Sequence, residues 1–240
     1  MSDSTCRPWA VGVVIPASNE EKTIGKCLRS ILSSAARCTR CEGLWVVVVA
    51  DCCSDQTATI AGRVLAGTGE VIECAVRSPG SARRIGARAV LEHFKGLDAK
   101  RIWLANTDAD THVPENWLDT HLRLADGSAS AVAGIVELDP DELRPEVARL
   151  HQQTYKLAAD GTHEHVHGAN LGVRADAYLD VGGWSDVQAS EDHCLWGRLT
   201  RRGWPVQSPT TSVVITSGRL QGRARGGFAD TLMRELRARE

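Results

Sequence analysis

The feature that most constrains the fold is a seven-residue apolar run, LWVVVVA (44–50), which ends directly at Asp51. A β-branched run without polar alternation is typical of a strand that is buried on both faces of a sheet. It is far shorter than the ~20 residues that a helix needs to span a bilayer. Further apolar runs predict strands at 10–17, 70–76, 101–108 and 130–138.

Helical patterns separate these apolar runs. Ile24, Leu28 and Ile31 recur at helical spacing after residues 18–21, which have the spacing of a capping box. Other helices are predicted after Ser54 or Asp55 and within 78–94, 114–125, 149–161 and 190–203. Strands that alternate with helices predict an α/β fold with a mostly parallel central sheet and helices on both faces. No internal repeat or linker is visible, which predicts a single domain over residues 1–220 and a basic C-terminal tail, 221–240, that is helical or mobile.

Composition excludes some classes of protein. A net charge of −2 in 240 residues provides no basic field for nucleic acid. The eight cysteines follow no hydrophobic signal segment, which favours reduced thiols and a cytoplasmic location. No transmembrane segment is predicted, and peripheral membrane contact stays open. Cys38 and Cys41 have CxxC spacing without a second pair, so a zinc ribbon is disfavoured. The histidines of HEHVH (163–167) favour a polar or site-lining strand over a zinc site.

Polar residues follow several predicted strands at the point where each strand ends. Residues 16–20 follow the first strand, Asp51 follows the second, and Asp108 and Asp110 follow the fourth. Ligands of parallel α/β sheets bind beyond the carboxyl ends of the strands. We therefore expect these side chains to line one edge of the sheet.

Each of these residues has a functional and a structural interpretation. Asp108 and Asp110 suit a divalent cation that neutralises a leaving diphosphate, or a simple surface turn. Asp51 suits a base or a ribose, or caps the next helix. The structural interpretation of Glu20 is an acid in the first turn of a helix, where it complements the helix dipole. Arg83 suits a base or a diphosphate, or lies on a solvated helix face.

The second half of the chain offers a candidate general base. Glu191 and Asp192 begin a predicted helix, where a carboxylate can either accept a proton or complement the helix dipole. Trp184 is expected either to stack on a sugar ring or to pack in the core. The first strand is followed by no GxGxxG, and the chain contains no GxxxxGK, which disfavours a dinucleotide-binding site and a P-loop.

Six segments occur in an order that resembles a known family: VVIPASNEEKTIGKCLRSI, VVVVADCCSDQTATIA, GSARRIGARA, NTDADTHVPENWL, GANLGVRADAYLDVGGW and SEDHCLWGRL. Over roughly residues 10–220 the chain is similar to the family 2 glycosyltransferases of GT-A fold. The resemblance implies a Rossmann-like GT-A domain, a nucleoside-diphosphate sugar donor, a divalent cation (Mn²⁺ or Mg²⁺) and inversion at the anomeric carbon.

The resemblance also implies roles for individual residues. The nucleotide-binding positions are Pro16, Ala17, Ser18, Glu20, Asp51, Arg83 and Asp108. Asp108 and Asp110 match the metal motif, with Asp110 favoured as the direct ligand. Glu191 and Asp192 match the catalytic acidic pair, with Asp192 favoured as the base. The acceptor and sugar region matches Gly168, Asn170, Gly183 and Trp184.

The chain departs from the family pattern at two places near its C-terminal end. Residues 211–219 lack the late histidine that many such enzymes add to the metal, so either water, diphosphate, Thr216 or Ser217 completes the shell or the metal is weakly held. The segment from Gln221 only loosely echoes the motif of processive synthases, which favours transfer of a single sugar. The spacing of Arg223 and Arg225 leads to the hypothesis that the tail closes over the diphosphate.

The function predicted from the sequence is thus a metal-dependent inverting glycosyltransferase, with a UDP-sugar favoured as donor. A nucleotidyltransferase of similar fold and a non-catalytic nucleotide-binding protein are the alternatives. The acceptor stays open among a small metabolite, a glycan and a lipid phosphate.

Overall fold

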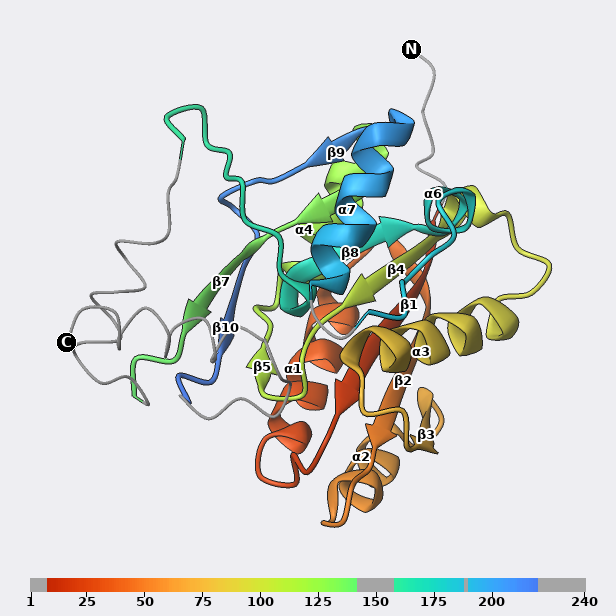
Figure 1. The fold of residues 1–240 in the computed structure, drawn as a ribbon, viewed down its shortest axis with the longest axis vertical. Helices are drawn as coiled ribbons and strands as arrows, with labels where there is room; N and C mark the ends of the chain where they lie inside the picture. The colour runs from red at the N-terminus through yellow and green to blue at the C-terminus, as the bar shows by residue number, and fades with distance from the viewer. Residues whose placement is uncertain (1–7, 142–157, 188–189, 220–240) are drawn as a thin grey trace.

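A seven-stranded sheet forms the centre of the molecule (Figure 1). The structure is a computed structural model that describes residues 8–141, 158–187 and 190–219. In sheet order the strands are β3 (Gly69–Cys74), β2 (Cys41–Asp51), β1 (Trp9–Ala17), β4 (Ile102–Asn106), β8 (Leu171–Arg174), β6 (Ala131–Ala133) and β9 (Val206–Gln207). β1 to β4 run parallel, whereas β8 is antiparallel to both β4 and β6. The predicted mostly parallel central sheet is confirmed.

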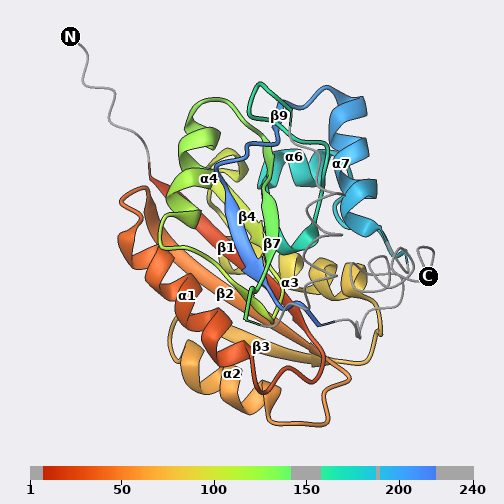
Figure 2. The same ribbon diagram turned by 90° about the vertical axis from the view of Figure 1, so that its left-hand side faces the viewer.

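Helices cover both faces of this sheet (Figure 2). One face carries α1 (Ile24–Arg37), α2 (Thr57–Leu65) and α4 (Trp117–Asp126), and the other carries α3 (Pro79–His93), α6 (Ala175–Asp180) and α7 (Glu191–Arg202). Successive residues of β1 divide between the two hydrophobic clusters, with Val13 and Ile15 on the α1 face and Val14 on the α3 face. Because side chains alternate along a strand, a strand covered on both faces needs an unbroken apolar run.

A second sheet was not predicted from the sequence. Its three strands are β5 (Thr111–His112), β10 (Val213–Thr216) and β7 (Ile135–Leu138). The single strand predicted at 130–138 is wrong, because the chain leaves the main sheet at Gly134 and β6 and β7 belong to different sheets. A Cβ atom at Gly134 would lie 2.2 Å from the side-chain nitrogen of Asn170, so there is no room for a side chain at the position where the chain changes sheets.

Several predicted helix starts differ in the structure. The helix expected after residues 18–21 begins only at Ile24, and the Thr23 hydroxyl donates to the Glu20 carboxylate at 3.0 Å. Ser190, directly before α7, adopts the left-handed conformation with φ 60°. Short 3₁₀ helices occur at Ala99–Arg101 and Gly168–Asn170.

Three other predictions concern the rest of the chain. The HEHVH segment forms no sheet strand. Most of the predicted helix at 149–161 and the whole 221–240 tail, with Arg223 and Arg225, lie outside the described residues. Among the helices that the structure describes, none has the length and apolar character required to cross a membrane.

Candidate active site

The predicted acidic residues meet at one edge of the sheet. Glu20 follows β1, Asp51 ends β2, and Asp108 and Asp110 follow β4, so all lie beyond the carboxyl ends of parallel strands. β8 is antiparallel to β4, which brings the residues before its N-terminal end, including Gly168, to the same edge. The acids at the carboxyl ends of β1, β2 and β4 therefore lie at the same edge as the 3₁₀ helix Gly168–Asn170.

Arg83, in the first turns of α3, joins the two halves of the site. Its guanidinium donates to the Asp108 carboxylate at 2.6 Å and also forms an ion pair with Glu191. The side chain is only 4% exposed and lies over the ring of Trp184, 5.4 Å from its centroid. Burial acts to lower the pKa of Arg83, but Asp108 and Glu191 outweigh it and the pKa lies above its usual value. Arg83 is therefore a permanent positive charge between two acids.

Gly168 makes this arrangement possible. A Cβ atom there would lie 2.5 Å from a guanidinium nitrogen of Arg83, so a side chain would displace the arginine. The Gly168 backbone N–H also donates to the Asp192 carboxylate at 2.9 Å. Gly168, predicted for the acceptor region, thus orients two charged residues through its backbone.

The two members of the acidic pair have different surroundings. Glu191 is buried and paired with Arg83. Asp192 is partly exposed, and its two oxygens accept from the backbone N–H groups of Gly168 and His193, at 2.9 and 2.8 Å. A carboxylate has about four lone-pair sites, so Asp192 keeps acceptor capacity on its exposed side. Asp192 is the better placed of the pair to accept a proton.

Arg219 was not predicted as a site residue. It follows β10, and its guanidinium pairs with both oxygens of Glu20, at 2.9 and 2.5 Å, and with Asp110 at 2.9 Å. Its only sequence signal is a basic residue four positions beyond a short apolar run, in the segment where the metal-binding histidine was missing. Glu20 and Arg219 are 199 positions apart, so no local pattern pairs them.

Asp110 is the most perturbed acid of the site. Burial raises its pKa to about 6, Asp108 and Glu20 add to the shift, and Arg219 opposes it. The Thr216 hydroxyl donates to Asp110 at 3.3 Å. A buried carboxylate beside two other acids is a group that a cation stabilises.

The remaining nucleotide-binding predictions fall on the first two strand ends. Asp51 is buried, and its oxygens accept from the backbone N–H groups of Arg77 and Ser78, at 3.0 and 3.1 Å. It thereby holds the turn that leads into α3. Pro16 and Ala17 end β1, and Ser18 follows them with a partly exposed side chain.

Two predicted acceptor contacts are corrected by the structure. The Asn170 side chain is fully buried: its nitrogen donates to the carbonyls of Ile135 and Ser212, and its oxygen accepts from Trp117. Trp184 is 2% exposed and packs in the hydrophobic cluster of the α3 face. Both side chains are enclosed by protein, so neither presents a surface to an acceptor.

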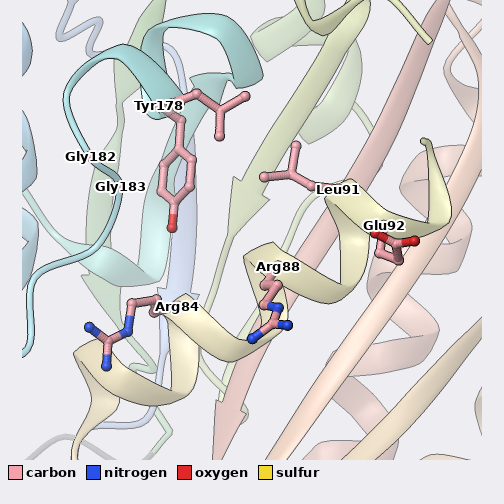
Figure 3. A pocket seen from close by; sticks show the side chains of 8 residues that line it. Arg84, Arg88, Leu91, Glu92, Tyr178, Gly182 and Gly183 are labelled. Atoms are coloured by element: carbon pink, nitrogen blue, oxygen red, sulfur yellow. The ribbon is translucent and has the colours of Figure 1, made fainter. Parts of the chain in front are cut away.

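Gly183 lines a separate hollow between α3 and α6 (Figure 3). Its φ is +65°, and a Cβ atom would lie 2.5 Å from the ring of Tyr178, so only glycine suits this turn. The hollow, of about 400 Å³, is lined by Arg84, Arg88, Leu91, Glu92, Tyr178, Leu179, Gly182 and Gly183. None of the clustered acids contributes to it, so the hollow is distinct from the acidic site.

The donor set fits one type of divalent cation site. No group of three or more His, Cys, Asp or Glu side chains in the described part of the chain is arranged to hold a metal ion. Mg²⁺-type ions are, however, commonly bound by one or two carboxylates together with substrate phosphates and water. Asp108 and Asp110 provide such a pair, and Asp110 lies in an acidic environment.

Comparison with known proteins identifies the family. The chain matches the family described as "Glycosyltransferase like family 2" over residues 8–231. It belongs to this family. No curated protein matches the chain in sequence.

Similarity to solved structures confirms the GT-A fold. A mannosyltransferase from Pyrobaculum calidifontis, solved with GDP-Man and Mn²⁺, is 21% identical with a TM-score of 0.65, and the match covers 90% of this chain and 59% of that one. S. aureus TarS 1–349 is 15% identical with a TM-score of 0.64, covering 87% and 60%. GalNAc-T7, solved with UDP, GalNAc and Mn²⁺, is 14% identical with a TM-score of 0.64, covering 90% and 46%. The glycosyltransferase domain described here spans about 60% of the first two proteins.

Proposed function

We propose that this chain transfers one sugar from a nucleoside-diphosphate sugar to an acceptor hydroxyl, with inversion and with a divalent cation at the diphosphate. The family and the fold support a glycosyltransferase. The observation that carries the proposal is the convergence of the Asp108 and Asp110 pair and the Asp192 carboxylate on one edge, linked through Arg83 and Gly168.

The charge balance of the site supports the cation. Among the described residues of this cluster, the carboxylates are Glu20, Asp108, Asp110, Glu191 and Asp192, and the guanidinium groups are Arg83 and Arg219. Five acids against two bases leave up to three formal negative charges, which would repel a diphosphate. A divalent cation that binds with the nucleotide would offset this repulsion.

The proposed chemistry assigns distinct tasks to the chain's own residues. Asp192 accepts the proton of the acceptor hydroxyl as that oxygen attacks the anomeric carbon. Gly168 orients the Asp192 carboxylate, while Glu191 and Asp108 hold Arg83 in place. Asp108 and Asp110 would hold the cation, which supplies Lewis-acid stabilisation of the departing diphosphate. Positioning of donor and acceptor in line removes part of the entropic barrier.

A UDP-sugar is the favoured donor in this proposal. UDP accompanies TarS and GalNAc-T7 in solved structures, whereas the Pyrobaculum enzyme was solved with GDP-Man. Asp51 and residues 16–18 lie at the edge where the nucleotide is proposed to bind. The hypothesis that Arg223 and Arg225 close over the diphosphate stays a prediction, and unchanged donor affinity and turnover in Arg223→Ala would refute it for Arg223.

Calorimetric titration with UDP, GDP, dTDP and CDP, each with and without Mn²⁺, tests the proposal on wild type and Asp110→Ala. We expect one nucleotide to bind in a Mn²⁺-dependent manner, and Asp110→Ala to lose that dependence. Turnover with the matching sugar nucleotides and a panel of acceptor hydroxyls then tests transfer.

Two results would favour the alternatives. Pyrophosphate release from a nucleoside triphosphate would favour a nucleotidyltransferase. Binding of a nucleotide without sugar transfer to any class of acceptor would favour a non-catalytic nucleotide-binding protein.

A further inference from the structure

Arg219 lies between the buried Glu20 and the largely buried Asp110 at the edge of the main sheet. Its guanidinium pairs with Glu20 through two nitrogens and with Asp110 through one of them. The side chains of Glu20 and Asp110 are only 6% and 11% exposed, and that of Arg219 is 31% exposed. The three residues follow β1, β4 and β10, so the contact joins the main sheet to the small sheet.

This guanidinium competes directly with the proposed metal ion. Asp110 is the favoured metal ligand, and one of its oxygens is 2.9 Å from an Arg219 nitrogen. The other oxygen accepts from Thr216 at 3.3 Å. A divalent cation and a guanidinium on the same carboxylate repel each other strongly at Asp110, whose side chain is 11% exposed, and less at Asp108, which contacts Arg83 but is 37% exposed and better screened by water. The same charge that stabilises Asp110 therefore disfavours metal binding to it.

We infer that Arg219 is the resident counter-ion of Asp110 and that it must withdraw from this carboxylate before a divalent cation binds there. The nucleotide diphosphate provides the next partner for the withdrawn guanidinium, because a planar fork of donors matches phosphate oxygens. Arg219 then couples the two ligands: metal alone binds weakly, and metal with nucleotide binds well. This inference rests on the proposed function, since it assumes the Asp110 cation site and a diphosphate ligand.

The test measures Mn²⁺ affinity in the absence of nucleotide, by calorimetry, on wild type, Arg219→Gln and Arg219→Lys. Arg219→Gln should bind Mn²⁺ tighter than wild type by roughly 5- to 150-fold, the usual range of coupling between two ligands. Arg219→Lys should fall between the two, because an ammonium group keeps the charge but cannot bridge Glu20 and Asp110 as a fork. The Lys variant also keeps the test available if Arg219→Gln does not fold.

Two controls separate this effect from general changes in charge. Arg202→Gln removes a guanidinium from an exposed pair with Asp180, remote from the acidic cluster, and should leave Mn²⁺ affinity unchanged. Adding Asp110→Asn to Arg219→Gln should abolish the gain. With saturating Mn²⁺, Arg219→Gln should also bind UDP more weakly than wild type.

The outcomes distinguish the inference from the proposed function. If wild type binds a nucleotide with Mn²⁺ but both Arg219 variants have wild-type Mn²⁺ affinity, the inference is wrong and the proposed function stands. If wild type binds none of the four nucleotides under any condition, the proposed function fails and the inference with it. The inference is supported if Mn²⁺ affinity is highest in Arg219→Gln, intermediate in Arg219→Lys and lowest in wild type.

Discussion

At the scale of single residues, neighbouring acids are distinguished by what each one contacts. Glu191 and Asp192 are adjacent in α7, yet Glu191 is buried against Arg83 and Asp192 keeps an exposed face. A carboxylate in a buried ion pair resists protonation. If it takes up a proton it loses its charge, and its buried cationic partner is left uncompensated. The same pair of letters in the sequence therefore provides one structural acid and one candidate base.

Exchange of each acid for its amide tests this division. Asp192→Asn should reduce turnover by roughly 10²- to 10⁴-fold, the range for loss of a general base, with little change in donor affinity. Glu191→Gln should act mainly through Arg83, lowering thermal stability and donor affinity more than the rate of the bound complex. Steady-state kinetics and nucleotide calorimetry measure both effects. Near-normal turnover in Asp192→Asn, with a large loss in Glu191→Gln, would exchange the two roles.

At the scale of elements, close packing of α3 on the sheet determines where Arg83 lies. A Cβ atom at Gly12 of β1 would lie 2.0 Å from a methyl group of Val90, so α3 approaches the strand where a side chain is missing. On the helix side, a Cβ atom at Gly86 would likewise lie 2.4 Å from a methyl group of Val14. Because Arg83 is on the same helix, this packing fixes its distance from Asp108.

Gly12→Ala should therefore destabilise the fold by about 1–3 kcal/mol, the usual cost of overpacking. The Gly12→Ala, Val90→Ala double variant should lose less stability than the sum of the losses in the two single variants, because the smaller residue at position 90 makes room for the new methyl group. Urea unfolding measures all three variants. Gly62→Ala in α2, where nothing lies within 4 Å of the added atom, is the matched control and should stabilise by about 0.5–1 kcal/mol. Strict additivity at Gly12 and Val90 would contradict the packing argument.

At the scale of the whole molecule, a buried polar network joins the two sheets. Asn170 contacts Trp117 of α4 and the backbone of Ser212, just before β10. His121 accepts from the Trp103 indole at Nδ1, 3.4 Å away, so its Nε2 carries the proton and lies 3.1 Å from the Ser212 hydroxyl. Burial lowers the pKa of His121 to about 4. A neutral imidazole is thus part of the junction between the sheets.

This junction predicts an acid-sensitive fold. The folded-state pKa of His121, about 4, lies below the ordinary value of 6.5, so between these values the unfolded chain binds more protons. Stability should fall as pH decreases from 6.5 towards 4, with a contribution on the order of 3 kcal/mol from this residue. Denaturant unfolding between pH 7 and pH 4.5 measures the slope. His121→Gln should show a shallower slope than wild type over that range, and equal slopes would exclude His121 as the cause.

Much of the fold could be predicted because its signals are local. Apolar runs such as 44–50 form strands and the 24–32 periodicity forms a helix, since period and branching depend only on neighbours along the chain. The split at Gly134 was not visible, because an apolar run shows no signal of a change of sheet. The late start of α1 was missed because the carboxylate of Glu21, the last residue of the predicted capping box, accepts from the backbone N–H of Gln56, 35 positions away.

The sequence by itself determined the family, the order of strands and helices along the chain, and the acids that follow the strands, because each is carried by a short stretch of neighbouring residues. Only the tertiary structure decided how those acids are paired: Arg83 with Asp108 and Glu191, Arg219 with Glu20 and Asp110, and Asn170 and Trp184 inside the protein. Pairing of charges depends on distances across the fold, and residues far apart in the chain become neighbours only when the sheet has formed.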